Sequence, residues 1–146
     1  MNRRRIRGFT LAELVIVIVI TAILAAIAIP QFSQPEIDAA WFHEQARSTV
    51  RYAQRTAVAQ RRCVFVSVAP PLLSLLYGDL NCVITGTAVQ DLARGQNVEI
   101  TAPAGVALSA APNPFRFNGL GQPSAAAIVT VGAKTITINA ETGYVQ

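Results

Sequence analysis

The longest run of apolar residues lies near the N-terminus, between Phe9 and Ile29. It contains 21 residues, of which only Glu13 is charged. As an α-helix it would be about 32 Å long at ~1.5 Å per residue, enough to cross the hydrocarbon layer of a bilayer. Four arginines stand within the first seven residues. The positive-inside rule therefore predicts that this end stays cytoplasmic and that the rest of the chain crosses the membrane.

The pattern changes at Pro30, which should kink a helix because proline lacks an N–H group and clashes with the preceding turn. The segment Ser33-Gln34-Pro35-Glu36 is typical of a capping box, so a kinked continuous helix and a short break both remain open. Apolar residues then recur at helical spacing, at Phe42, Ala46, Val50, Ala53 and Ala57. This stripe predicts an amphipathic helical half over residues 31–62 that packs on a sheet.

The remaining residues, 63–146, are rich in β-branched and aromatic side chains interrupted by glycine and proline, which is typical of short strands. Strands are predicted at residues 63–68, 72–77, 82–85, 98–101, 128–131 and 134–138. Gly132-Ala133 separates the last two, and a two-residue loop with glycine first suits a type II′ hairpin. The whole pattern predicts an α+β fold, with a long N-terminal helix packed on an antiparallel β-sheet domain.

The positive net charge of the chain comes from its N-terminal residues and not from the rest of the sequence. The net charge is +4, but from Phe9 onward eight basic side chains balance eight acidic ones. The excess therefore belongs to the extreme N-terminus, and the charge count alone does not support a basic nucleic-acid-binding domain.

Few residues are suited to metal binding or catalysis. The two cysteines, Cys63 and Cys82, would lie on the outer side of the membrane, where a disulfide is favoured over two buried thiols. With one histidine, His43, a cysteine and histidine zinc site lacks ligands. His43 stands alone on what looks like an exposed stretch of helix, so we expect a solvated side chain. The sequence contains no hydrolase or phosphate-loop motif, and it predicts a protein that is not an enzyme and has no cofactor.

Three arginines of the amphipathic half, Arg47, Arg51 and Arg55, are spaced four residues apart and share one helix face. One interpretation is a solvated face that complements the C-terminal end of the helix dipole. The alternative is a basic strip that contacts an acidic partner subunit or, less readily, DNA.

The N-terminal segment matches neither of two ordinary targeting signals. A secretory signal peptide has an apolar region of about 7–15 residues and a small-residue cleavage site, and Pro30-Gln31-Phe32 is not such a site. A plain membrane anchor does not explain Glu13, because a carboxylate within lipid costs at least a few kcal/mol. Residues 8–13, Gly-Phe-Thr-Leu-Ala-Glu, instead resemble the class III signal of type IV pilins and pseudopilins. Residues 23–32 resemble the second half of the pilin N-terminal helix.

This resemblance implies roles for three residues. Residues 1–8 would form a leader that a prepilin peptidase removes after Gly8, and Phe9 would become the N-methylated mature N-terminus. Glu13 would be the assembly residue, since its carboxylate can neutralise the new amine of Phe9 in an apolar setting. The alternative for Glu13 is a side chain that extends to the membrane interface. Other pilins or pseudopilins, the peptidase, an inner-membrane assembly platform and the lipid bilayer would be the partners.

The C-terminal half resembles a subgroup of this family. Phe115-x-Phe117, the hairpin and the terminal Thr142-Gly143-Tyr144-Val145 resemble the FimT/GspH-like minor pilins and pseudopilins, with minor pilins of mannose-sensitive haemagglutinin pili as close competitors. The expected protein is a structural subunit, first in the inner membrane with a periplasmic domain and then in a pilus or a type II secretion pseudopilus. The alternatives are a minor pilin that binds DNA or another ligand, and an ordinary anchored periplasmic protein.

Overall fold

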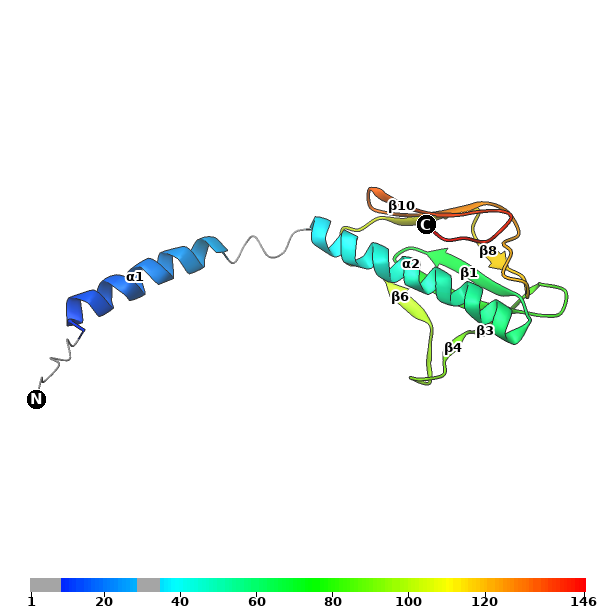
Figure 1. Cartoon of the computed structure of the whole chain (residues 1–146), viewed down its shortest axis with the longest axis horizontal. Helices are drawn as coiled ribbons and strands as arrows, with labels where there is room; N and C mark the ends of the chain where they lie inside the picture. The colour runs from blue at the N-terminus through cyan, green and yellow to red at the C-terminus, as the bar shows by residue number, and fades with distance from the viewer. Residues whose placement is uncertain (1–8, 29–34) are drawn as a thin grey trace, which may run out of the picture. The chain divides into compact units, whose positions relative to one another are not determined.

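The computed structural model describes residues 9–28 and 35–146. These residues belong to two compact units, one within Met1–Gln34 and one comprising Pro35–Gln146. The first unit contains helix α1 (Leu11–Ala28), and the second contains helix α2 (Pro35–Gln60) and all the strands (Figure 1). The predicted kink at Pro30 and the predicted cap at Ser33 lie outside the described residues.

Helix α2 has sequence signals at both ends. It begins at Pro35, a residue whose fixed φ suits the first helical position, and Glu36 and Asp38 in its first turn complement the helix dipole. At the other end, Arg61 adopts a left-handed conformation with φ of 49°. The Arg61 N–H donates to Val58 O and the Arg62 N–H donates to Ala57 O, which is the Schellman arrangement. The helix therefore ends at Gln60, two residues before the predicted boundary.

The predicted apolar stripe of α2 is confirmed. Its five members, Phe42, Ala46, Val50, Ala53 and Ala57, are completely buried. They bring α2 against two strands of one sheet, β1 (Val64–Ala69) and β8 (Phe115–Phe117), and against two strands of another, β9 (Ala127–Val131) and β10 (Lys134–Ile138). The helix thus covers both sheets, and its stripe lies in the core that they share.

The first sheet is antiparallel and has the order β3-β2-β1-β8, with β6 also paired to β2. Its strands are β1 (Val64–Ala69), β2 (Leu72–Gly78), β3 (Ile84–Ala88), β6 (Glu99–Thr101) and β8 (Phe115–Phe117). Strand β3 starts two residues after the predicted start at Cys82, because Cys82 has a φ of 58° and belongs to the preceding turn. Phe115 and Phe117 lie on one face of β8, with their rings edge to face and the ring centroids 5.9 Å apart.

The second sheet is also antiparallel and has the order β10-β9-β7. Its strands are β7 (Leu108–Ala111), β9 (Ala127–Val131) and β10 (Lys134–Ile138). The predicted hairpin is confirmed, since Lys134 pairs with Val131 across Gly132-Ala133 and Gly132 has a φ of 59°. The division into two sheets was not predicted.

A third, two-stranded sheet was also missed by the sequence analysis. Strands β4 (Gln90–Asp91) and β5 (Gln96–Asn97) pair with each other and project away from the sheets on the β6 side (Figure 1). The observed architecture is nevertheless the predicted one: an α+β domain in which a helix packs on antiparallel β-structure.

Candidate functional site

Helix α1 is apolar on every side. From Phe9 to Ala25 every side chain is exposed within the described structure, including ten large aliphatic residues from Leu11 to Leu24. Thr21 lies among them, but its hydroxyl donates to the carbonyls of Val17 and Ile18 and so is satisfied within the helix. A helix that is apolar all round needs lipid or other protein around it.

The N-terminus of α1 is closed by a capping box that the sequence analysis did not identify. The Thr10 hydroxyl accepts a hydrogen bond from the Glu13 N–H at 3.2 Å. The Glu13 carboxylate in turn accepts from the Thr10 hydroxyl at 3.1 Å and from the Thr10 N–H at 3.3 Å. The Thr-x-x-Glu spacing was visible in the sequence and is the signal that could have revealed it. The carboxylate is thereby held at the first turn of the helix.

The structure leaves the other predicted N-terminal roles open. Gly8 lies outside the described residues, and Phe9 is exposed. Cleavage after Gly8, methylation of Phe9 and the assembly role of Glu13 stay predictions. In the ranges 9–28 and 35–146, no helix combines the length and hydropathy needed to span a membrane.

The three predicted arginines of α2 differ in their surroundings. Arg51 donates to the backbone carbonyl of Val145 at 2.9 Å, and Arg47 lies 3.4 Å from the Glu44 carboxylate. Both are partly buried, whereas Arg55 is exposed. Arg55 lines an open, polar hollow of about 450 Å³ between α2 and the β4–β5 hairpin. A basic contact face therefore stays a prediction, with Arg55 as its most accessible member.

The expectation of a solvated His43 was wrong. The side chain is buried, with only 8% of the residue exposed, and its Nε2 atom lies 3.4 Å from Thr135 O on β10. His43 precedes Ala46 by three residues and Val50 by seven, so it belongs to the buried face of α2. Among the described residues, no group of three or more His, Cys, Asp or Glu side chains could hold a metal ion.

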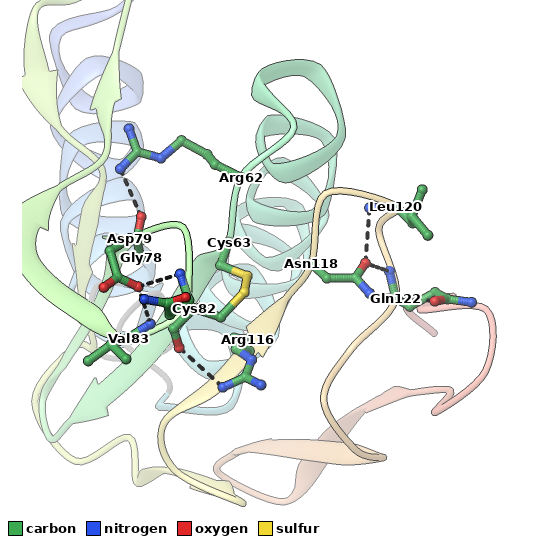
Figure 2. The surroundings of a disulfide bond; sticks show 11 residues. Arg62, Cys63, Gly78, Asp79, Cys82, Val83, Arg116, Asn118, Leu120 and Gln122 are labelled. Carbon is green, nitrogen blue, oxygen red and sulfur yellow. Dashed lines mark hydrogen bonds between the residues drawn. A yellow bond between two sulfur atoms is a disulfide. The ribbon is translucent and has the colours of Figure 1, made fainter.

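The predicted disulfide between Cys63 and Cys82 is present, with the two Cα atoms 5.3 Å apart. It ties the start of β1 to the turn after β2 (Figure 2). Arg62 donates to Gly78 O at 2.9 Å and stacks on the Tyr77 ring, with 4.0 Å between its Cζ atom and the ring centroid. Arg116 of β8 donates to Cys82 O at 3.2 Å. These contacts fix the turn against the connection between α2 and β1 and against β8.

Side-chain hydrogen bonds also order the two loops next to the disulfide. The Asp79 carboxylate accepts from the N–H groups of Asn81 and Val83, and the Asn118 side chain accepts from those of Leu120 and Gln122 (Figure 2). The end of the domain that carries the disulfide is consequently a well-ordered surface rather than a set of free loops.

Comparison with known proteins gave two findings, one for the N-terminal segment and one for the fold. Residues 3–29 match the family model described as the prokaryotic N-terminal methylation motif. A search of curated proteins gave no match.

Solved structures of a minor pseudopilin and of a minor pilin are similar to this chain. The minor pseudopilin EpsH from the type 2 secretion system of Vibrio cholerae is 13% identical, with a TM-score of 0.51 over 78% of this chain and 95% of that one. The type IV minor pilin FimU of Pseudomonas aeruginosa is 14% identical, with a TM-score of 0.50 over 80% of this chain and 89% of that one. At these identities the likeness is one of fold. The chain thus carries the prokaryotic N-terminal methylation motif in front of a domain with the fold of these two proteins.

Proposed function

We propose that this protein is a minor pilin or pseudopilin of the FimT/GspH-like group. A prepilin peptidase would cut it after Gly8 and Phe9 would be N-methylated. The mature chain would then assemble through its N-terminal helix into a type IV pilus or a type II secretion pseudopilus. The observation that carries the proposal is α1, a helix with apolar side chains on all sides, whose first turn holds a carboxylate. The likeness to a minor pilin and a minor pseudopilin supports the subgroup.

The physical logic is an exchange of one apolar environment for another. Before assembly, lipid of the inner membrane would cover α1 while the domain lies in the periplasm. In the filament, the same helices would cover one another. Leaving lipid is then offset by packing between helices, since apolar association within lipid depends on van der Waals contact and interhelical polar interactions.

Glu13 would favour the filament over the membrane in this exchange. Cleavage after Gly8 creates a cationic amine on Phe9, and an isolated charge in an apolar surrounding is costly unless it is paired. The capping box places the Glu13 carboxylate within hydrogen-bonding distance of Thr10, the residue next to Phe9. A subunit arriving in the filament can thus pair its amine with a carboxylate at the same level, which fixes the axial position of the helix.

The partners would be other pilin-type subunits, the peptidase and the assembly platform. The role is structural, and the chain is a substrate of the peptidase rather than an enzyme itself.

The substitution Glu13→Gln tests the proposal, because glutamine retains a hydrogen-bond acceptor for the capping box but removes the charge. We expect the variant to be cleaved and to remain in the membrane fraction, with its amount in sheared filaments at least tenfold lower. Glu141→Gln is the matched control, since it removes an exposed acid from the folded domain. Normal recovery of the Glu13→Gln protein in filaments would contradict the proposed assembly role.

A further inference from the structure

An exposed apolar and basic surface surrounds the C-terminal end of α2. We call it the disulfide face and define it by Val58, Arg61, Leu80, Gly119 and Leu120. Two adjoining hollows of about 610 and 650 Å³ meet there, and both are lined by Arg61 and Gly119. Leu80 is fully exposed, and Leu120 and Val58 are 80% and 47% exposed. Apolar side chains gathered in this way are typical of a surface that another protein covers.

The disulfide face is rigid. Leu80 lies within the turn that the Cys63–Cys82 bond closes, and Leu120 lies in the loop held by Asn118. A Cβ atom on Gly119 would lie only 3.0 Å from the backbone carbon of Arg61, so this loop packs directly on the end of the helix. A preformed surface loses little conformational entropy when a partner binds.

The disulfide face is also positively charged. Arg61 is exposed, and Arg62 and Arg116 bind backbone carbonyls at the two ends of the adjoining turn, those of Gly78 and Cys82. The nearby acid, Asp79, is already engaged by two backbone N–H groups. A partner that brings carboxylates together with apolar side chains would complement this surface.

The opposite end of α2 has this complementary chemistry. Ile37 and Trp41, spaced four residues apart on one helix face, are 58% and 67% exposed. Glu36 and Asp38 stand beside them in the first turn and are exposed. Helix α2 has 26 residues and is about 39 Å long at ~1.5 Å per residue, so the two surfaces lie at opposite ends of the domain.

We propose that the disulfide face binds the first turns of α2 of a second copy of this chain. Ile37 and Trp41 of the second copy would pack against Leu80 and Leu120, and Asp38 would face Arg61. Such a contact is head-to-tail, because it joins two different surfaces of the chain. The inference rests on the proposed assembly into a filament and adds a specific contact between neighbouring domains.

Photocrosslinking of the full chain in cells tests this contact. A benzophenone amino acid at position 120 should give at least fivefold more crosslinked dimer than the same group at position 92. Leu92 is 90% exposed, against 80% for Leu120, but lies in the turn of the β4–β5 hairpin. The crosslinked peptide should contain residues 36–44 of a second copy. Equal crosslinking at both positions, or a crosslink to another protein or to another segment, would overturn the inference.

Charge exchange provides an independent measurement. Arg61→Glu and Asp38→Arg should each lower the crosslinked dimer at least threefold, and the double variant should restore most of it. Arg94→Glu, at a side chain that is 80% exposed on the β4–β5 hairpin, is the matched control and should change nothing. Failure of the double variant to restore crosslinking contradicts the pairing.

Filament recovery and cleavage, measured in the same cells, distinguish a failure of this inference from a failure of the proposed function. Filaments that contain the protein without the crosslink would refute the contact and leave the function intact. Loss of both the cleavage after Gly8 and the filaments would refute the function as well.

Discussion

Thr10 and Glu13 hold each other through reciprocal hydrogen bonds at the start of α1. The Thr10 hydroxyl accepts from the Glu13 N–H, and the Glu13 carboxylate accepts from the Thr10 hydroxyl and N–H. The residue expected to act in assembly is therefore also the residue that closes the N-terminus of the helix. Both roles use the Glu13 carboxylate, but only the assembly role requires its charge, so a substitution that keeps an acceptor can separate them.

Thr10→Val should loosen the first turn of α1 without changing its shape or charge. Loss of an N-cap costs about 1 kcal/mol, which corresponds to about fivefold faster amide exchange in that turn. Hydrogen exchange of the detergent-solubilised full chain measures this effect at residues 12–14. Thr10→Ser keeps the hydroxyl and should exchange like the parent protein. Parent-like protection in Thr10→Val would show that the capping box does not stabilise the helix start.

Removal of the disulfide should destabilise the folded domain. Cys63 and Cys82 are 19 residues apart, and closing a loop of this size contributes about 3 kcal/mol in the loop-entropy picture. Urea unfolding of the Cys63→Ser/Cys82→Ser double variant, followed by circular dichroism, measures the loss. The parent protein in reductant should shift in the same direction. Coincident unfolding curves for parent and variant would contradict the prediction.

Gly143→Ala should destabilise the domain more than alanine at another glycine with a positive φ. A Cβ atom at position 143 would overlap the carbonyl oxygen of Gly121 and would lie 2.6 Å from Gln54 Nε2. The same Gln54 atom donates to Gly121 O at 2.9 Å, so the overlap also disrupts a bond between α2 and a loop. We expect a loss of about 3 kcal/mol from overpacking and a left-handed φ together.

Gly105→Ala is the control for this prediction. Gly105 has a φ of 84°, against 69° at Gly143, but a Cβ atom there meets nothing within 4 Å. The left-handed conformation alone should cost about 1 kcal/mol. Thermal unfolding of the two variants side by side compares these costs. Equal destabilisation would mean that backbone conformation, and not the contact with Gly121, decides the effect.

Local patterns predicted those parts of the fold that depend on neighbouring residues. The stripe from Phe42 to Ala57 predicted the buried face of α2, and alternation around Gly132-Ala133 predicted the hairpin, because each pattern reflects one face of one element. The same helical spacing also includes His43. The prediction missed its burial because it relied on the polarity of histidine and not on the position of His43 on the helix.

Other features depend on segments that are distant in the chain. The separation into two sheets follows from pairing β7 with β9 and β8 with β1, which no local pattern specifies. The two cysteines suggested a disulfide, but the contacts of Arg62 with Tyr77 and of Arg116 with Cys82 required the folded arrangement. The spacing of Gly8, Phe9 and Glu13 suggested a candidate site at the N-terminus, and the roles of these residues stay predictions. The disulfide face was not predicted, because it joins α2 to two separate loops.

The central claim is that the chain is processed and assembled as a pilin-type subunit, and intact-mass measurement of the membrane-extracted protein tests it most directly. The account predicts the loss of residues 1–8, the addition of one methyl group at Phe9 and the absence of two hydrogens because of the disulfide. A protein that still begins at Met1 and carries no methyl group would contradict it.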